Sequence, residues 1–274
     1  MNAPLAGLRR PELDIAVERR GAASCLVGRY VTYPFHLTRA FTLDAACPEV
    51  ATLYMQSSSG GFYAGEDLTV RVRIGTGAAL HLTTQASTLV HGDCGRPARM
   101  RVLIEVAAGG FLAYTPDPQI LFPGAASDTR VEIALQGDGA AFLTDGLLVH
   151  DPNRAGGAPL SYKSRVDVRR DGQLVASDRQ VIDGSHLARP DGPLHGHRVA
   201  ASGLWLAVPA DAHGFEDALA YAGCLAGVSA LPNGAGLGLR LLARDGAAHE
   251  AAMRAAFVHV FAAHFGVPPA LRRK

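Results

Sequence analysis

Three polar, glycine-rich segments carry the residues whose types and spacing could do chemistry. The segments are 53–67, 81–87 and 116–125, and they lie at the ends of strand-like apolar runs. None of them is a nucleophile elbow, a phosphate loop or a metal cage. The segments supply hydroxyls, an amide and a pair of carboxylates, but no general base at the spacing of a catalytic motif. Such groups suit a polar surface or passage better than an active site. The residues concerned are Glu66, Asp67, Thr83, Thr84 and Gln85.

Each of these groups also has an ordinary structural explanation. The adjacent carboxylates Glu66 and Asp67 point to opposite faces if they lie on a strand, so they fit a solvated strand start as well as a cation path. Hydroxyls such as that of Thr83 could satisfy hydrogen bonds at the end of a ladder. Asp145 ends an apolar arm, where a turn with Gly146 would explain it. Both interpretations stay open at this point.

Two short histidine-containing segments offer candidate metal ligands. His91 and Cys94 are separated by three positions, and His195 and His197 would share one face of an extended segment. Imidazole and thiolate suit a borderline metal such as nickel. No second cluster with matching spacing completes either site. We therefore expect exposed loop residues and assign no tight metal site.

Composition limits the class of protein. At 274 residues the chain could form one large domain or two small ones. Its 26 basic and 25 acidic residues give no long-range attraction for nucleic acid. Apolar residues make up 48% and charged residues only 19%, which favours a protein that works inside a complex.

Cysteine spacing and hydropathy predict the compartment. The four cysteines are scattered without a C-x-x-C pair, and residues 1–20 lack the apolar core of a signal peptide. The chain contains no run of eighteen apolar residues. We expect a reduced, cytoplasmic protein that does not span a membrane.

An internal repeat is the strongest structural signal. Alternating apolar runs end at glycine turns near residues 76, 109, 138 and 171, a spacing of about thirty residues that is typical of stacked β-units. Leu68, Val70, Val72 and Ile74 fall on one face of the first run, as in a half-buried antiparallel strand closed by a hairpin turn. The predicted fold is mainly β, a β-helix-like or solenoid-like stack of β-arms, with a small helical C-terminal region.

The periodicity changes near residue 209. Residues 215–222 and 247–265 are predicted helices, and Gly266 ends the second one. The apolar stripe of that helix predicts packing on the sheet, with a partner interface as the alternative. We expect a stacked β domain over 1–208 and a helix-containing region over 209–274, packed together as one structural unit.

Together and in this order, the three segments resemble the urease accessory protein family UreD, also called UreH. Residues 60–68 match G-G-x-x-A-G-[DE]-x-L, residues 83–86 match T-T-Q-A, and residues 116–125 match P-[DEQ]-x-x-I-L-F-x-G-A. The resemblance extends from about 29 to 184. The family motif residues that are matched are Gly60, Gly61, Gly65, Pro116, Asp117, Phe122 and Gly124.

This resemblance implies a non-enzymatic factor for urease maturation. Such a protein would bind apo-urease and the accessory protein UreF, so that nickel from the GTPase UreG reaches the urease active site. No cofactor would be tightly bound, and nickel would pass in transit. A weakly coordinating corridor passes a hydrated dication, whereas a tight cage would trap it. The corridor residues would be Glu66, Asp67, Thr83, Thr84, Gln85 and Asp145.

Two alternatives remain beside this interpretation. A β-stacked hydrolase could draw paired carboxylates from Asp67, Asp117 and Asp145, which would have to face each other within about 5 to 10 Å. The absence of common catalytic motifs disfavours this reading. A purely structural clamp without metal passage is the other possibility.

Overall fold

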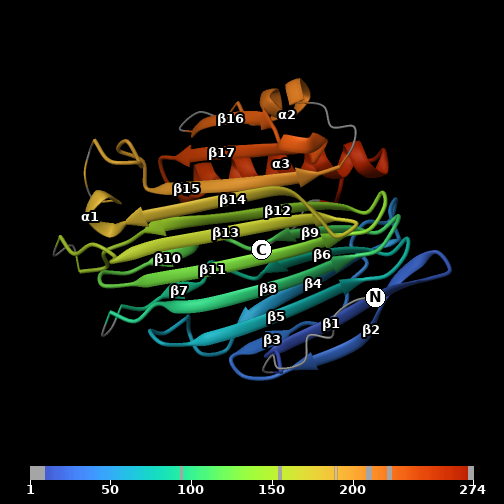
Figure 1. Cartoon of the computed structure of the whole chain (residues 1–274), viewed down its shortest axis with the longest axis horizontal. Coiled ribbons are helices and arrows are strands. Elements are labelled where there is room, and N and C mark those ends of the chain that lie inside the picture. Colours follow the sequence, from blue (N-terminus) through green and yellow to red (C-terminus); the bar gives the residue numbers. More distant parts are fainter. Residues whose placement is uncertain are drawn as a thin grey trace.

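The computed structural model describes residues 10–92, 95–153, 156–187, 189, 191–207, 212–220 and 224–270. Over these residues the strands form two facing sheets, here called sheet A and sheet B (Figure 1). In spatial order, sheet A contains β14 (Gln173–Asp183), β13 (Ser161–Arg170), β11 (Ala126–Leu135), β8 (Ala98–Val106), β5 (Asp67–Ile74), β1 (Leu13–Arg20) and β2 (Ala23–Val31).

Sheet B runs from the C-terminal strands to an early hairpin. Its spatial order is β16 (Cys224–Ala230), β17 (Leu237–Ala243), β15 (Val199–Leu206), β12 (Ala140–Val149), β9 (Phe111–Thr115), β6 (Ala79–Thr84), β4 (Val50–Ser57) and β3 (Phe35–Leu37). Two short strands, β7 (Leu89–Val90) and β10 (Gln119–Leu121), pair beside this path. The helices are α1 (Gly184–Leu187), α2 (Ala212–Ala218) and α3 (Gly246–Phe265).

The middle of the chain winds as a β-solenoid. Each turn places one strand in sheet A and the next in sheet B, and every strand pairs in parallel with its equivalent one turn away. Val70, Val102 and Val131 therefore stand in register on three successive turns, all buried between the sheets. The predicted stack of repeats is confirmed.

The predicted antiparallel hairpins are wrong for three of the four repeats. The glycine turns near 76, 109 and 138 carry the chain from sheet A to sheet B instead of reversing it within one sheet. Only the turn at 171 closes a hairpin, between β13 and β14. Alternating burial has the same period in parallel and antiparallel strands, so it could not separate the two pairings.

The glycine turns stack on one another at one end of the solenoid. The backbone N–H of Gly109 donates to Asp138 Oδ1 at 2.7 Å, and that of Gly137 donates to Asp171 Oδ1 at 2.9 Å. Both glycines have positive φ, which a residue with a side chain rarely adopts. These aspartates therefore fix the spacing of successive turns.

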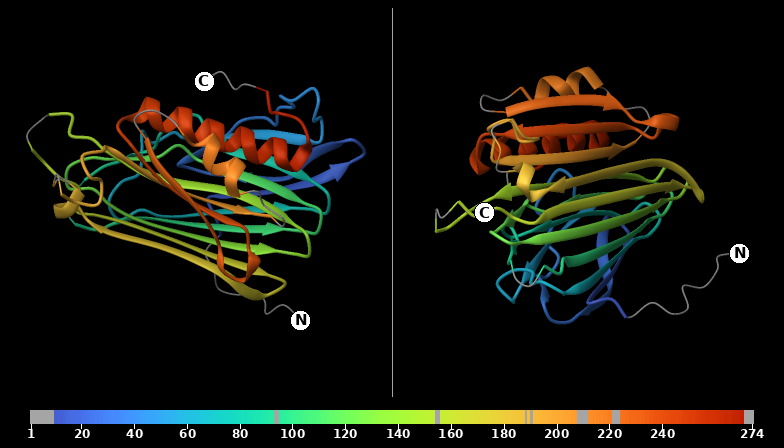
Figure 2. Two further views of the ribbon diagram at one scale, coloured as in Figure 1. Left: turned by 90° about the horizontal axis from the view of Figure 1, so that it is seen from above. Right: turned by 60° about the vertical axis from the view of Figure 1, so that its left-hand side comes forward.

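The C-terminal region continues sheet B and covers its outer face. Strands β15, β17 and β16 join it as antiparallel neighbours. Helices α2 and α3 lie on one side of the molecule, and sheet A forms the other side (Figure 2). Phe257 and Phe261 of α3 belong to the same buried cluster as Phe111 and Phe142 of sheet B.

The two predicted helices are present, with changed limits for the first. Helix α3 begins after Asp245 and ends at Gly266, whose φ of 75° is the left-handed conformation expected of a C-cap. Helix α2 covers Ala212–Ala218 and so starts and ends earlier than the predicted 215–222. No helix among the described residues is long and apolar enough to cross a membrane.

The N-cap of α3 provides a stability test. The Asp245 carboxylate accepts the backbone N–H of Ala248 at 2.9 Å. Asp245→Ala removes this acceptor and should lower the free energy of unfolding by about 1 kcal/mol, whereas Asp245→Asn retains a capping oxygen and should cost much less. Thermal denaturation followed by circular dichroism measures both variants. Equal losses of unfolding free energy in the two variants would show that the capping oxygen contributes nothing.

Candidate functional site

The three polar segments meet at one edge of the solenoid, opposite the stacked glycine turns. They follow the C-terminal ends of β4, β6 and β9, which are parallel neighbours in sheet B. Parallel strands end at the same edge, so segments separated in sequence come together there. This end of the sheet is polar because each repeat contributes one such segment.

The hydrogen-bonded ladder of sheet B is interrupted at this edge. Strand β12 pairs with β9 over residues 140–143 and with β10 over 147–149. Residues 144–146 therefore lie beside Pro116–Pro118, where two prolines lack the N–H needed to continue the ladder. This stretch without ladder pairing, between two strands that are otherwise adjacent, is here called the opening.

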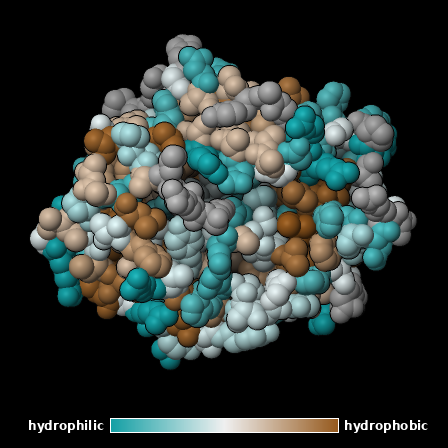
Figure 3. Space-filling model, turned by 180° about the vertical axis from the view of Figure 1, so that it is seen from behind, coloured by the Kyte–Doolittle hydropathy of each residue, from teal (hydrophilic) through white to brown (hydrophobic). Residues whose placement is uncertain are grey.

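Two cavities meet at this interruption from opposite faces of the sheet. A cavity of ≈ 70 Å³ lies on the outer face beneath α3, and one of ≈ 40 Å³ lies between the sheets. Either volume can hold water. Figure 3 shows the side of the molecule on which α3 lies, where polar residues separate apolar patches. Both cavities are lined by Pro116, Asp117, Thr144 and Asp145.

Asp145 occupies the inner side of the opening. Its neighbours at alternate positions, Leu143 and Leu147, belong to the core between the sheets, so its carboxylate points inward. It accepts the N–H of Gly146 at 2.8 Å and the hydroxyl of Ser164 from sheet A. Burial raises the pKa of Asp145, and these hydrogen bonds only partly offset that effect.

Two tyrosines share the low-dielectric surroundings of Asp145. The hydroxyls of Tyr114 and Tyr162 are buried, and that of Tyr162 lies close enough to Asp145 to help lower the pKa of its carboxyl. Burial is the first cause of their raised pKa, and the negative charge of Asp145 is the second. Both phenols therefore stay protonated and can turn an oxygen or a proton toward the carboxylate.

A polar seam continues from Asp145 through the apolar interior. Ser202 of β15 stands opposite Asp145 in the ladder and accepts a hydrogen bond from the Gln180 amide at 2.8 Å. The next strand places Arg240 in register with Ser202, and Arg240 pairs with Asp178 of sheet A at the sandwich edge. In the other direction Thr84, Gln119 and Thr129 also line the inner cavity.

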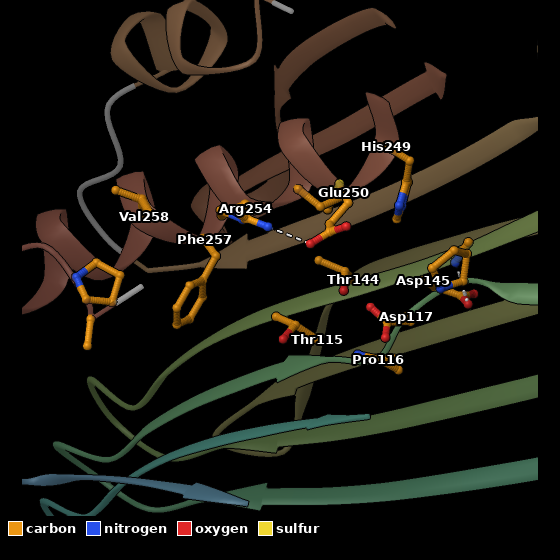
Figure 4. Close-up of a pocket in the computed structure, with 15 residues that line it drawn as sticks. Thr115, Pro116, Asp117, Thr144, Asp145, His249, Glu250, Arg254, Phe257 and Val258 are labelled. Atoms are coloured by element: carbon orange, nitrogen blue, oxygen red, sulfur yellow. Dashed lines mark hydrogen bonds and ion pairs between the residues drawn. The ribbon is translucent and has the colours of Figure 1, made fainter. Parts of the chain in front are cut away.

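The outer cavity has a mixed electrostatic lining (Figure 4). From α3, Glu250 and Arg254 form an ion pair, with His249 one position before the glutamate. Below it, Thr115 of β9, Thr144 of β12 and Asp117 of the β9–β10 connection face the helix. Carboxylates outnumber cations around this space, which favours entry of a cation over that of an anion.

The predicted corridor residues separate into two groups. Thr84 and Asp145 both line the inner cavity, and Thr84 Oγ1 accepts the N–H of Asp117 at 2.8 Å. Thr83 lies on the other face of the same strand, where its hydroxyl donates to Thr115 O at 2.6 Å. Gln85 is exposed and hydrogen-bonded to Gln56.

The two adjacent carboxylates lie away from the opening. Asp67 is exposed on the outer face of sheet A, and its neighbour Leu68 points into the core. Glu66 accepts the N–H of Tyr63 at 3.0 Å and thereby closes its own turn. Neither residue lines the two cavities at the interruption. Of the three carboxylates considered for a hydrolase, only Asp117 and Asp145 share a cavity.

The glycine motif and the aromatic residues join the polar segments. A Cβ on Gly61 would lie 2.5 Å from Leu89 O, so the chain can pass here only as glycine. His91 stacks on Tyr63 with ring centroids 4.6 Å apart, and it meets the edge of Phe122 at 5.5 Å. This aromatic cluster holds the first polar segment, 53–67, against the third, 116–125. Gly60, Gly65 and Gly124 adopt positive φ in the adjoining turns.

The other candidate ligands are not gathered into a site. His195 is exposed in a loop, and the His197 ring contacts the backbone oxygens of Leu194 and His195. Cys94 lies outside the described residues. Within the described part of the chain, no group of three His, Cys, Asp or Glu side chains is arranged to hold a metal ion.

Sequence reasoning missed most of the polar seam. Ser164, Asp178, Ser202 and Arg240 carry no motif, and they meet only because strands distant in sequence face each other. The alternation of core-facing and solvent-facing residues along β13 could have identified one of these residues. A serine at residue 164 between Tyr162 and Val166 is a polar group in a core-facing position.

The raised pKa of Asp145 predicts a pH-dependent stability. Between the ordinary carboxyl pKa of about 3.9 and the folded value, the folded state retains a proton that the unfolded state has lost, so stability falls as pH rises. Each unit of difference corresponds to about 1.4 kcal/mol. Asp145→Asn removes this penalty and should raise the melting temperature above that of the natural chain at pH 7, but not below pH 4.

Melting curves at both pH values measure the effect, with the exposed Asp67→Asn as the control. A lower melting temperature for Asp145→Asn at pH 7 would mean that its hydrogen bonds outweigh the burial of the charge.

Comparison with known proteins identifies the family. A family model described as UreD urease accessory protein matches residues 9–274. The chain is 40% identical to Urease accessory protein UreD 1 of Methylorubrum populi, over 100% of this chain and 94% of that protein. It is 42% identical to UreD 1 of Bradyrhizobium sp. strain BTAi1, over 97% and 95%, and 33% identical to UreD 1 of Pseudomonas syringae pv. syringae, over 95% and 94%. These relatives are named as urease accessory proteins, and the chain belongs to the UreD family of urease accessory proteins.

Proposed function

We propose that this protein is a scaffold of urease maturation through which nickel ions pass. Its membership of the family places its role in urease maturation. The observation that carries the finer proposal is the pair of cavities that meet at Asp117 and Asp145 on opposite faces of sheet B. Nickel would enter on one face, cross the interrupted ladder and follow the polar seam between the sheets.

The chemistry of the opening suits transit of a divalent cation. Carboxylate, hydroxyl and carbonyl oxygens bind nickel more weakly than imidazole and thiolate do, and they exchange water readily. When ionised, Asp145 supplies one negative charge in a low-dielectric setting, which lowers the barrier for a cation there. The mixed oxygen lining therefore supports passage in preference to storage.

The partners in this proposal are UreF, the GTPase UreG and the urease structural subunits. The scaffold would hold UreF and apo-urease while UreG supplies the ion. The described cysteines Cys25, Cys47 and Cys224 are unpaired, which supports a reducing cytoplasmic location. A structural clamp without ion transit is the competing proposal, and nickel loading separates the two.

Substitution of Asp145 tests the passage. Asp145→Leu replaces the central carboxylate with an apolar group, which should raise the barrier to a hydrated dication. An increase of about 1.4 kcal/mol slows transfer about tenfold, so urease matured with this variant should contain less nickel and show lower activity. Asp67→Leu changes an exposed carboxylate outside both cavities and should leave loading unchanged.

Nickel per urease is measured by atomic absorption, together with a pull-down of the complex. Normal loading by Asp145→Leu would refute the passage. Parallel losses of binding and loading would instead favour the clamp.

The edge of sheet B predicts the behaviour of the isolated chain. Strand β16, Cys224–Ala230, is an edge strand without charged residues, and Leu225 is 55% exposed. Such an edge favours self-association, so the protein alone should form oligomers in light scattering. UreF should reduce them, and Leu225→Lys should do so without UreF. A stable monomer that UreF does not affect would contradict the assembly proposal.

A further inference from the structure

Four arginines form one continuous row on the outer face of sheet A. Arg101 of β8 stands in register with Arg130 of β11, Arg130 with Arg165 of β13, and Arg165 with Arg179 of β14. On the first three strands the residue that follows each arginine is a buried valine, exemplified by Val131, so the arginine side chains point to solvent. Arg179 is exposed on the same face. This face is the one turned toward the viewer in Figure 1.

The row carries positive charge that its surroundings balance only in part. Like charges directly opposite one another on neighbouring strands are destabilising. Carboxylates lie in the two flanking rows, but the contacts of Arg101 and Arg130 with them are too long for hydrogen bonds, whereas Arg165 pairs closely with Asp167. The closest pairs are Arg101–Glu132 at 3.8 Å, Arg130–Asp128 at 3.7 Å and Arg165–Asp167 at 2.6 Å.

Most of the donor capacity of this row is unused. A guanidinium group has five N–H donors in a planar fork. The side chains of Arg101, Arg130 and Arg179 donate no hydrogen bond to any described residue. A partner that brings oxygen acceptors can therefore bind without breaking a strong contact in this protein.

A shallow hollow borders the row at one end. Its volume is ≈ 300 Å³, and its lining combines Arg101 and Arg130 with the side chains of Thr69 and Leu103. Arg101 and Arg130 are thus part of the wall of a depression with both charged and apolar contacts. Depressions of this mixed character are typical of protein contact surfaces.

We propose that this arginine row is a docking surface for a partner protein helix that presents a stripe of carboxylates. Strands lie about 4.8 Å apart, so four arginines span about 14 Å. Carboxylates at positions i, i+4 and i+8 of a helix span about 12 Å along one face, since each residue rises about 1.5 Å. Such a helix, lying across the strands, meets the row along most of its length.

The flanking carboxylates favour a protein over a nucleic acid. Asp128, Glu132 and Asp167 would lie beneath a phosphate backbone and repel it, whereas a helix can offer neutral or basic residues beside its acidic stripe. The net charge of the chain is only +1, which provides little attraction for a polyanion. This inference is independent of the proposed nickel passage.

The test measures binding of a synthetic helical peptide. A fluorescent, alanine-based peptide of about 20 residues carries glutamate at every fourth position, and a matched peptide carries glutamine there. Fluorescence anisotropy at low and physiological ionic strength compares the natural chain with Arg101→Gln/Arg130→Gln. A second double variant, Arg19→Gln/Arg20→Gln, makes the same change in net charge at the β1–β2 hairpin. Circular dichroism checks that each variant is folded.

We expect the glutamate peptide to bind and the glutamine peptide not to bind. Arg101→Gln/Arg130→Gln should weaken binding by about tenfold or more, while the hairpin variant should behave as the natural chain. Arg101→Lys/Arg130→Lys keeps the charges and should retain part of the affinity. This result would show that the weaker binding of the glutamine variant is not caused by misfolding. The proposal is overturned if the glutamate peptide does not bind. It is equally overturned if Arg19→Gln/Arg20→Gln weakens peptide binding as much as Arg101→Gln/Arg130→Gln does. It is also overturned if single-stranded DNA binds the row more tightly than the peptide.

Discussion

Main-chain pairing between successive turns is the constraint on which this structure depends. Each strand must satisfy its N–H and C=O groups with the equivalent strands one turn before and one turn after it. Residues at equivalent positions therefore form straight rows, such as the buried Val70, Val102 and Val131. The same pairing in register that aligns apolar residues between the sheets also aligns Arg101 and Arg130 on the outer face of sheet A. The glycine turns gather at one end and the polar segments at the other for this reason.

The candidate site arises where that pairing is broken. Pro116 and Pro118 cannot donate to a neighbouring strand, and the ladder of sheet B resumes only at β10. A closed sheet would separate the space under α3 from the space between the sheets. The interruption instead brings two cavities to the same four residues, with Asp145 at their meeting point. A gap in hydrogen bonding thus supplies the geometry that the proposed passage requires.

Asp145 shows why such an opening conflicts with packing. A carboxylate between Leu143 and Leu147 lies in a core that would otherwise be apolar, and burial raises its pKa. Ser164 and the Gly146 N–H compensate only in part, so ionisation of this carboxyl costs stability. An apolar residue at this position would remove the carboxylate from the polar seam. We interpret the retained charge as the basis of the proposed function.

The sequence by itself determined the repeat, the face of each strand and the family. The thirty-residue spacing predicted the stack, Leu68 to Ile74 predicted the buried face, and the three segments predicted UreD. Only the tertiary structure decided the pairing direction and the membership of the site. Buried and exposed residues alternate in the same way in parallel and antiparallel strands. The sequence pattern therefore could not predict that each glycine turn carries the chain from one sheet to the other. Glu66 and Asp67 belong to a candidate segment but lie away from the opening, whereas Ser164 and Ser202 reach Asp145 through contacts between distant strands. Such contacts depend on which strands become neighbours, and no local pattern records that.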